Sequence, residues 1–237
     1  MTSRNILVYT RTTGYRHDSI PAGVAAFRGL GAQHGFTVHA TEDPATFTAE
    51  RLASSDAVVF LSTSGDVLEP AGRRALLGRV AEGGGFLGVH SATCTEYDWP
   101  DYGALVGARF DGHPEIQPGL VNVVDRSHPA TAHLPERWTW TDEWYNFRDG
   151  PTGVTVLATV DENSYRGGTM GLHHPLIWYR EYGAGRSFYT ALGHTEHAFD
   201  EPDFRRHLLG ALRWAAGWTD DGADANQPTA SDAARRC

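Results

Sequence analysis

The sequence predicts an α/β fold: three layers, with one mainly parallel sheet of the flavodoxin or amidotransferase kind and helices on both faces. Strand-like and helix-like segments alternate four times in the first half of the chain, which is typical of parallel sheets with crossover helices. Residues 56–62 (DAVVFLS) are almost continuously apolar, as expected when helices cover both faces of a strand. Beyond residue 116 tight turns join the strands, so antiparallel hairpins should extend the sheet.

The first half contains a predicted helix with clear boundary residues. Ser19 is a candidate N-cap, Pro21 lies in the first turn, and the helix should end before Gly35. The remaining elements of this half are, in order, strands at 5–10, 36–41, 56–62 and 84–89 and helices at about 48–54 and 70–82.

The second half changes to consecutive strands and then a closing helix. Its expected strands lie at 116–125, 138–147, 153–161, 175–182 and 186–192, and its helix at 203–216. Residues 183–185 (GAG) should form the turn of a hairpin. We therefore predict a single domain over residues 1–218. The segment 219–237 lacks large apolar residues, so we expect a disordered tail.

Composition limits the classes of function. A net charge of −9 without a basic stripe argues against nucleic acid and anionic membranes as partners. With only two cysteines, one of them in the polar C-terminal segment, we expect no disulfide framework, and the N-terminus shows no long apolar segment. We expect a cytoplasmic protein that acts on a small molecule, either alone or as a homo-oligomer.

Histidines follow several of the predicted strands. His17 comes after the first strand, His90 directly after the fourth, and His194 after the last. Because the carboxyl ends of parallel strands meet at one edge of the sheet, these three side chains should converge there. The same reasoning places Arg11 and Asp66 near this edge. Each of these histidines could instead cap a turn or satisfy a core hydrogen bond, and twelve histidines suggest an acid–base or metal site without proving one.

Other residues are candidates on weaker grounds. The stretch TDEWYNF (141–147) alternates as a strand does, which puts Glu143 and Tyr145 on one face as a possible general base and its aromatic neighbour. Trp99 could offer a flat surface to a sugar ring. Cys94 lies one helical turn beyond the corner at His90 and has no basic neighbour, so a nucleophilic thiol is disfavoured.

The chain resembles the ThuA-like (trehalose-utilisation) family, whose fold is related to class I glutamine amidotransferases. The resemblance covers roughly residues 5–217 and is carried by the stretches TRTTGYRHDSIPAG, GGGFLGVHSAT, YDWPDYGALVGARFDGHP, TDEWYNF, HHPLIWY and GRSFYTALGHT. In the amidotransferases the corner after the glycine-flanked strand carries a catalytic cysteine. Here His90 stands at that corner and His194 at the partner position, which argues against glutaminase activity.

The resemblance implies sugar metabolism and gives two further candidate histidines. His113 and His174 belong to His-Pro pairs of the family motif. We expect His90 and His194 to bind a divalent metal, most plausibly zinc, with His174 or His113 as third ligand and His113 otherwise a substrate contact. Two ligands of one zinc ion should lie well within about 8 Å of each other. Glu143, His17 and Tyr145 are the expected catalytic residues.

Three functions remain open from the sequence. The first is a metal-assisted enzyme acting on 3-keto-glycosides or related oxidised disaccharides, by elimination, hydrolysis or isomerisation through an enolate. The second is a non-catalytic sugar-binding subunit that works with a separate oxidoreductase, since no dinucleotide fingerprint occurs in the chain. The third is a cysteine hydrolase built on Cys94.

Overall fold

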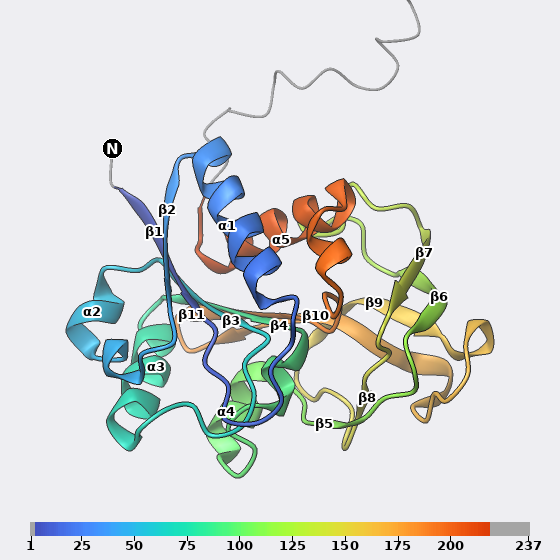
Figure 1. Ribbon diagram of the computed structural model, residues 1–237, viewed down its shortest axis with the longest axis horizontal. Helices are drawn as coiled ribbons and strands as arrows, with labels where there is room; N and C mark the ends of the chain where they lie inside the picture. Colours follow the sequence, from blue (N-terminus) through green and yellow to red (C-terminus); the bar gives the residue numbers. More distant parts are fainter. Residues whose placement is uncertain (1–2, 219–237) are drawn as a thin grey trace, which may run out of the picture.

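A nine-stranded sheet dominates the computed structural model, which describes residues 3–218 (Figure 1). The predicted tail at 219–237 lies outside the described residues. Within the described range the strand order is β2-β1-β3-β4-β11-β10-β9-β6-β7, and β5 and β8 form a separate small pair. The strands are β1 (Arg4–Tyr9), β2 (Phe36–Thr41), β3 (Ala57–Leu61), β4 (Gly85–Val89), β5 (Phe110–Gly112), β6 (Gln117–Val123), β7 (Arg137–Asp142), β8 (Asn146–Phe147), β9 (Thr155–Asp161), β10 (His174–Tyr182) and β11 (Gly185–Thr190).

One half of the sheet is parallel and the other antiparallel. Strands β2, β1, β3, β4 and β11 run parallel to one another. Strands β10, β9, β6 and β7 continue the same sheet as an antiparallel extension. The central strands β3 and β4 are buried along their whole length, which explains their continuous apolar sequences. The expected fold class is therefore confirmed.

Helices cover both faces of the parallel half (Figure 1). Helices α1 and α5 pack together on one face, and α2, α3 and α4 lie on the other. The α-helices are α1 (Ile20–His34), α2 (Ala49–Ala53), α3 (Pro70–Ala81), α4 (Pro100–Val106) and α5 (Pro202–Ala215). Short 3₁₀ turns are η1 (Pro44–Thr46), η2 (His90–Cys94), η3 (Glu162–Ser164), η4 (Gly171–His173) and η5 (Glu196–Phe199). No helix among residues 3–218 is long and apolar enough to cross a membrane.

The boundaries of α1 agree with its sequence, but its cap does not. The helix ends at Gly35, whose φ of 71° is in the left-handed region that glycine adopts without strain. Ser19 occupies the N-cap position, yet its hydroxyl donates to the carbonyl of Gly193 instead of accepting from the helix. This contact ties the start of α1 to the loop after β11. Helix α4 and strand β5 were not predicted.

Candidate metal centre and its pocket

His90 stands at a strained corner between β4 and the 3₁₀ turn η2. Its φ of 52° is unusual for a residue with a side chain, and such strain concentrates at functional sites. The ring is fully buried, and Nδ1 lies 2.8 Å from the carbonyl oxygen of Ala191. A carbonyl can only accept, so Nδ1 donates to it, and the tautomer with this proton on Nδ1 presents the lone pair of Nε2 to the cluster. This arrangement is typical of histidines that bind metals.

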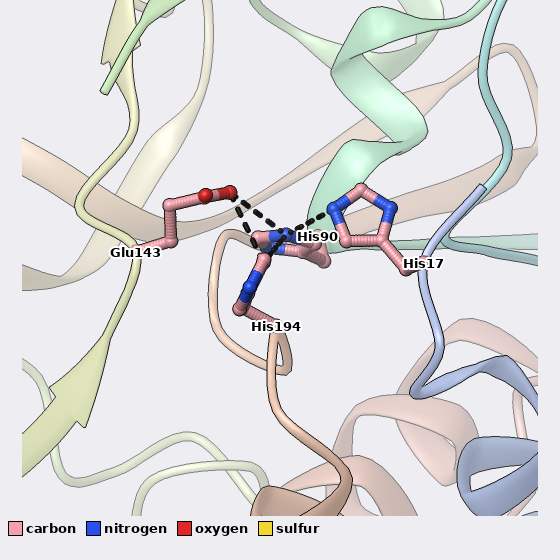
Figure 2. A group of neighbouring side chains, drawn as sticks. All are labelled: His17, His90, Glu143 and His194. Carbon is pink, nitrogen blue, oxygen red and sulfur yellow. Dashed lines mark hydrogen bonds and ion pairs between the residues drawn. The ribbon is translucent and has the colours of Figure 1, made fainter. Parts of the chain in front are cut away.

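Two further histidines meet the free nitrogen of His90 (Figure 2). Nε2 of His17, in the loop after β1, lies 3.1 Å from Nε2 of His90. Nδ1 of His194, in the loop after β11, lies at the same distance. The predicted convergence of strand ends therefore brings these three rings together, and the 3.1 Å between His90 and His194 is far inside the expected limit.

Glu143 reaches the same point from the antiparallel half of the sheet. It follows the last residue of β7, and its Oε2 lies 3.1 Å from Nδ1 of His194 and 3.5 Å from Nε2 of His90. Figure 2 shows the carboxylate and the three imidazoles pointing toward one another. One ligand atom from each of the four side chains can be chosen so that all lie within 4.8 Å of one another.

The donor set fits a divalent metal ion. Zinc is bound by imidazole nitrogen and carboxylate oxygen at about 2.0–2.2 Å, so the edges of a regular tetrahedron of ligands are about 3.3–3.6 Å long. The contacts among His90, His194 and Glu143 span 3.1–3.5 Å, close to that value. His17 is the fourth donor and lies 3.1 Å from His90. The residues can thus hold an ion after small adjustments.

Burial, together with the neighbouring histidines, favours metal binding over proton binding at His17. Burial lowers the pKa of His17 to about 3, and the neighbouring His90 and His194 act in the same direction, so the ring is neutral near pH 7. Burial by itself would raise the pKa of Glu143. The hydrogen bonds with His194 and His90 outweigh burial and hold that pKa well below its usual range. Burial alone would lower the pKa of His194. The hydrogen bond to Glu143 and the negative charge of that carboxylate outweigh burial and raise the pKa of His194.

A pocket of about 570 Å³ opens beside the cluster, within the usual range for small-molecule sites. His17 and Glu143 form part of its wall. Aromatic rings supply much of the remainder, and the lining residues are Gly14, Tyr15, His17, Ser64, Gly65, Ser91, Cys94, Tyr97, Phe110, His113, Glu143 and Tyr145. The lining combines flat apolar surfaces with polar groups that converge at one point.

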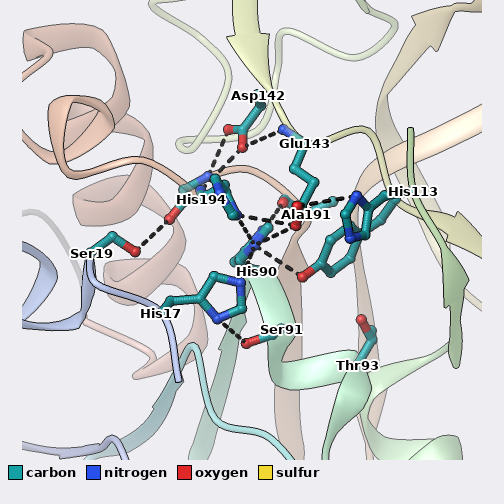
Figure 3. Close-up of polar contacts among 12 residues, drawn as sticks. His17, Ser19, His90, Ser91, Thr93, His113, Asp142, Glu143, Ala191 and His194 are labelled. Atoms are coloured by element: carbon teal, nitrogen blue, oxygen red, sulfur yellow. Dashed lines mark hydrogen bonds and ion pairs between the residues drawn. The ribbon is translucent and has the colours of Figure 1, made fainter. Parts of the chain in front are cut away.

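Tyr145 and His113 line the same pocket as Glu143, although the strand expected at 138–147 already ends at Asp142. The hydroxyl of Tyr145 is 3.0 Å from Nε2 of His90, and burial raises the pKa of this tyrosine well above its usual value. Nδ1 of His113 is 3.1 Å from Oε1 of Glu143, the carboxylate oxygen that does not face His194. Two lining residues therefore contact the cluster: the Tyr145 hydroxyl contacts His90, and the His113 ring contacts Glu143. Figure 3 shows His113 and Glu143 beside His90.

The structure corrects the place of His174. This histidine is fully buried and both of its ring nitrogens contact protein groups: Nε2 lies 2.7 Å from the carbonyl oxygen of Tyr145, and Nδ1 lies 2.9 Å from both Glu162 and the Tyr165 hydroxyl. It is not part of the four-residue cluster, where His17 takes the place expected for it. His174 is the first residue of β10 and does not follow a strand. Its ring therefore lies behind Tyr145 and not in the cluster.

Three expected substrate contacts lie away from the pocket lining. Asp66 is exposed, with an oxygen 3.7 Å from Arg73. Trp99 stacks on Tyr102, with ring centroids 6.1 Å apart. Arg11 is partly buried and is also absent from the lining. These residues do come from loops at the correct edge of the sheet, but position after a strand does not determine the direction of a side chain.

Three aromatic residues of the pocket, Tyr15, Tyr97 and Phe110, were not predicted from the sequence. Tyr15 lies two residues before His17, with ring centroids 4.8 Å apart. Phe110 packs on Tyr145 at 4.4 Å, and Tyr97 follows η2. Their nearness in sequence to His17 and to the corner at His90 was the available signal. Cys94 also lines the pocket, but burial raises the pKa of its thiol to about 12.

The fold and site define an α/β protein in which histidine occupies the strand-to-turn corner and a carboxylate completes a metal-type cluster. The ThuA family model, described as "Trehalose utilisation", matches residues 5–215. The chain therefore belongs to the ThuA family, whose description concerns the use of trehalose.

Solved structures show the same fold. A ThuA-like protein from Parabacteroides merdae is similar with a TM-score of 0.77 at 23% identity, over 96% of this chain and 95% of that one. A ThuA-like protein from Bacteroides uniformis gives 0.75 at 23% identity, over 90% and 91%. A cytoplasmic protein from Salmonella typhimurium gives 0.62 at 12% identity, over 90% and 98%. No curated protein matches the sequence.

Proposed function

We propose that this protein is a metal-assisted enzyme that acts on 3-keto-glycosides or related oxidised disaccharides. The observation that carries the proposal is the convergence of His17, His90, His194 and Glu143 beside a pocket with aromatic walls. The family description adds the link to disaccharide use. A structural metal alone would not need an open pocket next to its ligands.

The residues around the cluster suit proton transfer next to a ketone. A carbonyl at C3 acidifies the neighbouring C–H bond, and a bound divalent metal would add to this effect as a Lewis acid. Oε1 of Glu143 faces His113 and the pocket, so this oxygen is the proposed base that removes the proton. Tyr145, whose hydroxyl contacts Nε2 of His90, is the proposed proton donor to the departing glycosidic oxygen or to the carbon. His17, the third expected catalytic residue, serves as a metal ligand in this scheme.

Aromatic surfaces in the pocket support a sugar as the substrate. Tyr15, Tyr97 and Phe110 line the pocket beside the cluster. Aromatic faces bind the apolar faces of sugar rings while their edges leave hydroxyl groups free for hydrogen bonds. This role, expected for Trp99, passes to these three residues.

Turnover of a 3-keto-disaccharide by the zinc-loaded protein tests the proposal. Glu143→Gln removes the base but keeps an oxygen donor, so we expect turnover to fall by about 10²–10⁴-fold. The matched control is Glu162→Gln, whose carboxylate contacts His174 behind the pocket. Full activity of Glu143→Gln, or no turnover by the zinc-loaded wild type, contradicts the proposal.

A non-catalytic sugar-binding subunit is the second candidate. It is favoured by the aromatic pocket together with the lack of a dinucleotide fingerprint in the sequence, since oxidation of the sugar would then need a separate oxidoreductase. Metal analysis combined with the turnover assay separates the two candidates. A metal-free protein that binds the sugar without turnover supports the second.

A further inference from the structure

Asp142 joins the two halves of the sheet at the site. It is the last residue of β7 and is fully buried. In the sheet β7 is separated from β11 by β10, β9 and β6. Nevertheless its carboxylate contacts the loop that follows β11 and carries His194. This contact passes across three strands, so the hydrogen bonding of the sheet does not account for it.

Four donors converge on this one carboxylate. Oδ1 accepts from the backbone N–H groups of Glu143 at 2.9 Å and His194 at 3.1 Å. Oδ2 accepts from the backbone N–H of Gly193 at 2.9 Å and from the Trp140 indole at 2.8 Å. A carboxylate can take all four hydrogen bonds, whereas an amide offers one oxygen and would turn an N–H₂ group toward other donors. Figure 3 shows Asp142 between Glu143 and His194.

Two of the residues whose backbone N–H groups bind Asp142, Glu143 and His194, are members of the four-residue cluster. Glu143 and His194 come from opposite halves of the sheet, and their side chains meet at 3.1 Å. Oδ1 of Asp142 holds the backbones of both at once. The glycine between Leu192 and His194 has a φ of 109°, which aims two successive N–H groups at the carboxylate. A second tie, from Ser19 to the carbonyl of Gly193, fixes the same loop.

We infer that Asp142 is a positioning residue that sets the separation of Glu143 and His194 and thereby the metal affinity of the site. This inference rests on the proposed metal site. Asp142 does not belong to the cluster itself, and it acts through the backbones of two of its members. Partners of this kind change metal affinity by about 10–100-fold when they are mutated.

The test compares zinc affinity and the visible spectrum of the cobalt(II)-loaded protein for wild type and Asp142→Asn. We expect zinc to bind about 10–100-fold more weakly to the variant, with a changed cobalt spectrum because the ligand geometry is altered. The matched control is Glu96→Gln. Glu96 is equally buried and accepts two backbone N–H bonds, from Val67 and Leu68, but lies outside the cluster. Its variant should lose thermal stability while keeping wild-type zinc affinity and spectrum.

Three results overturn the inference: unchanged zinc affinity in Asp142→Asn, an unchanged cobalt spectrum, or an equal loss of affinity in Glu96→Gln. If Asp142→Asn does not fold, Asp142→Glu keeps the charge but displaces the carboxylate by one methylene, and wild-type zinc affinity in that variant overturns it too. A wild type that binds no divalent metal contradicts the proposed function instead. A crystal structure of Asp142→Asn tests the positioning role directly. Oε2 of Glu143 and Nδ1 of His194 should lie more than 3.5 Å apart in it, and a retained 3.1 Å contact contradicts the role.

Discussion

Nε2 of His90 lies 3.1 Å from Nδ1 of His194, although 104 positions separate the two residues in the sequence. The hydrogen bond from Nδ1 of His90 to Ala191 leaves the Nε2 lone pair directed at this contact. Nε2 of His17 and the hydroxyl of Tyr145 approach the same nitrogen. The single lone pair of that nitrogen cannot accept hydrogen bonds from His17, His194 and Tyr145 at the same time. A cation at the centre would satisfy the nitrogen lone pairs together.

Cys94 should be dispensable. Burial raises the pKa of its thiol to about 12, so almost no thiolate exists near pH 7 and the residue is a poor nucleophile. We expect Cys94→Ala to keep turnover of the keto-sugar within a factor of about two to three and to resist inactivation by iodoacetamide. An inactive Cys94→Ala variant that retains zinc and a native circular dichroism spectrum would instead support a cysteine hydrolase.

Tyr15 should contribute to sugar binding without taking part in the chemistry. Its side chain is 69% exposed at the pocket, and its backbone carbonyl accepts a hydrogen bond from Ser64, which holds the loop. A ring contact contributes about 0.5–1.5 kcal/mol, so Tyr15→Ala should raise KM by about two- to tenfold with kcat nearly unchanged. Leu172→Ala is the control, because Leu172 is also exposed but lies outside the pocket lining. Equal KM values for Tyr15→Ala and wild type contradict this role.

Buried histidines remote from the site should make the fold sensitive to acid. Burial lowers the pKa of His207 to about 3 and that of His128 to about 4, whereas in the unfolded chain histidine titrates near pH 6.5. Between these values the unfolded state binds more protons, so the free energy of unfolding rises with pH. Their contribution is complete above about pH 6.5 and is lost progressively as the pH falls toward 3.

His207→Asn tests this effect. Asparagine does not titrate, and its amide can replace the hydrogen bond that Nδ1 of His207 makes to the carbonyl of Ala130. Between pH 6.5 and pH 5 the wild type should lose about 2 kcal/mol more stability than the variant, as judged by urea unfolding. Parallel stability curves for the two proteins over this range are incompatible with a neutral buried His207.

The sequence predicted the architecture well because hydrophobic patterns and boundary residues are local. The continuous apolar stretch at β3 and the glycine after α1 are examples. It also predicted that His17, His90 and His194 meet, since parallel strands end at a common edge. The directions of loop side chains depend on contacts between distant segments. For that reason Trp99 was misplaced and Tyr15 was overlooked.

The wrong place expected for His174 and the omission of Asp142 have the same origin. His174 belongs to a family motif, but its ring contacts Glu162 and the Tyr145 carbonyl behind the pocket. Asp142 shares the TDEWYNF stretch with Glu143, but no pattern in the sequence distinguishes it as a site residue. The strand ends at Asp142, and its carboxylate binds a loop from the other half of the sheet. Contacts across three intervening strands leave no pattern in a single sequence.

The metal content of the purified protein tests the central claim most directly. Elemental analysis and zinc titration should show about one divalent ion per wild-type chain, and His90→Ala should lose it with an unchanged circular dichroism spectrum. His133→Ala is the control, because its ring contacts the carbonyl of Asp203 away from the cluster; it should retain the ion. A wild-type protein that takes up no stoichiometric zinc, cobalt or manganese, or a His90→Ala variant that binds zinc as wild type does, would contradict the account.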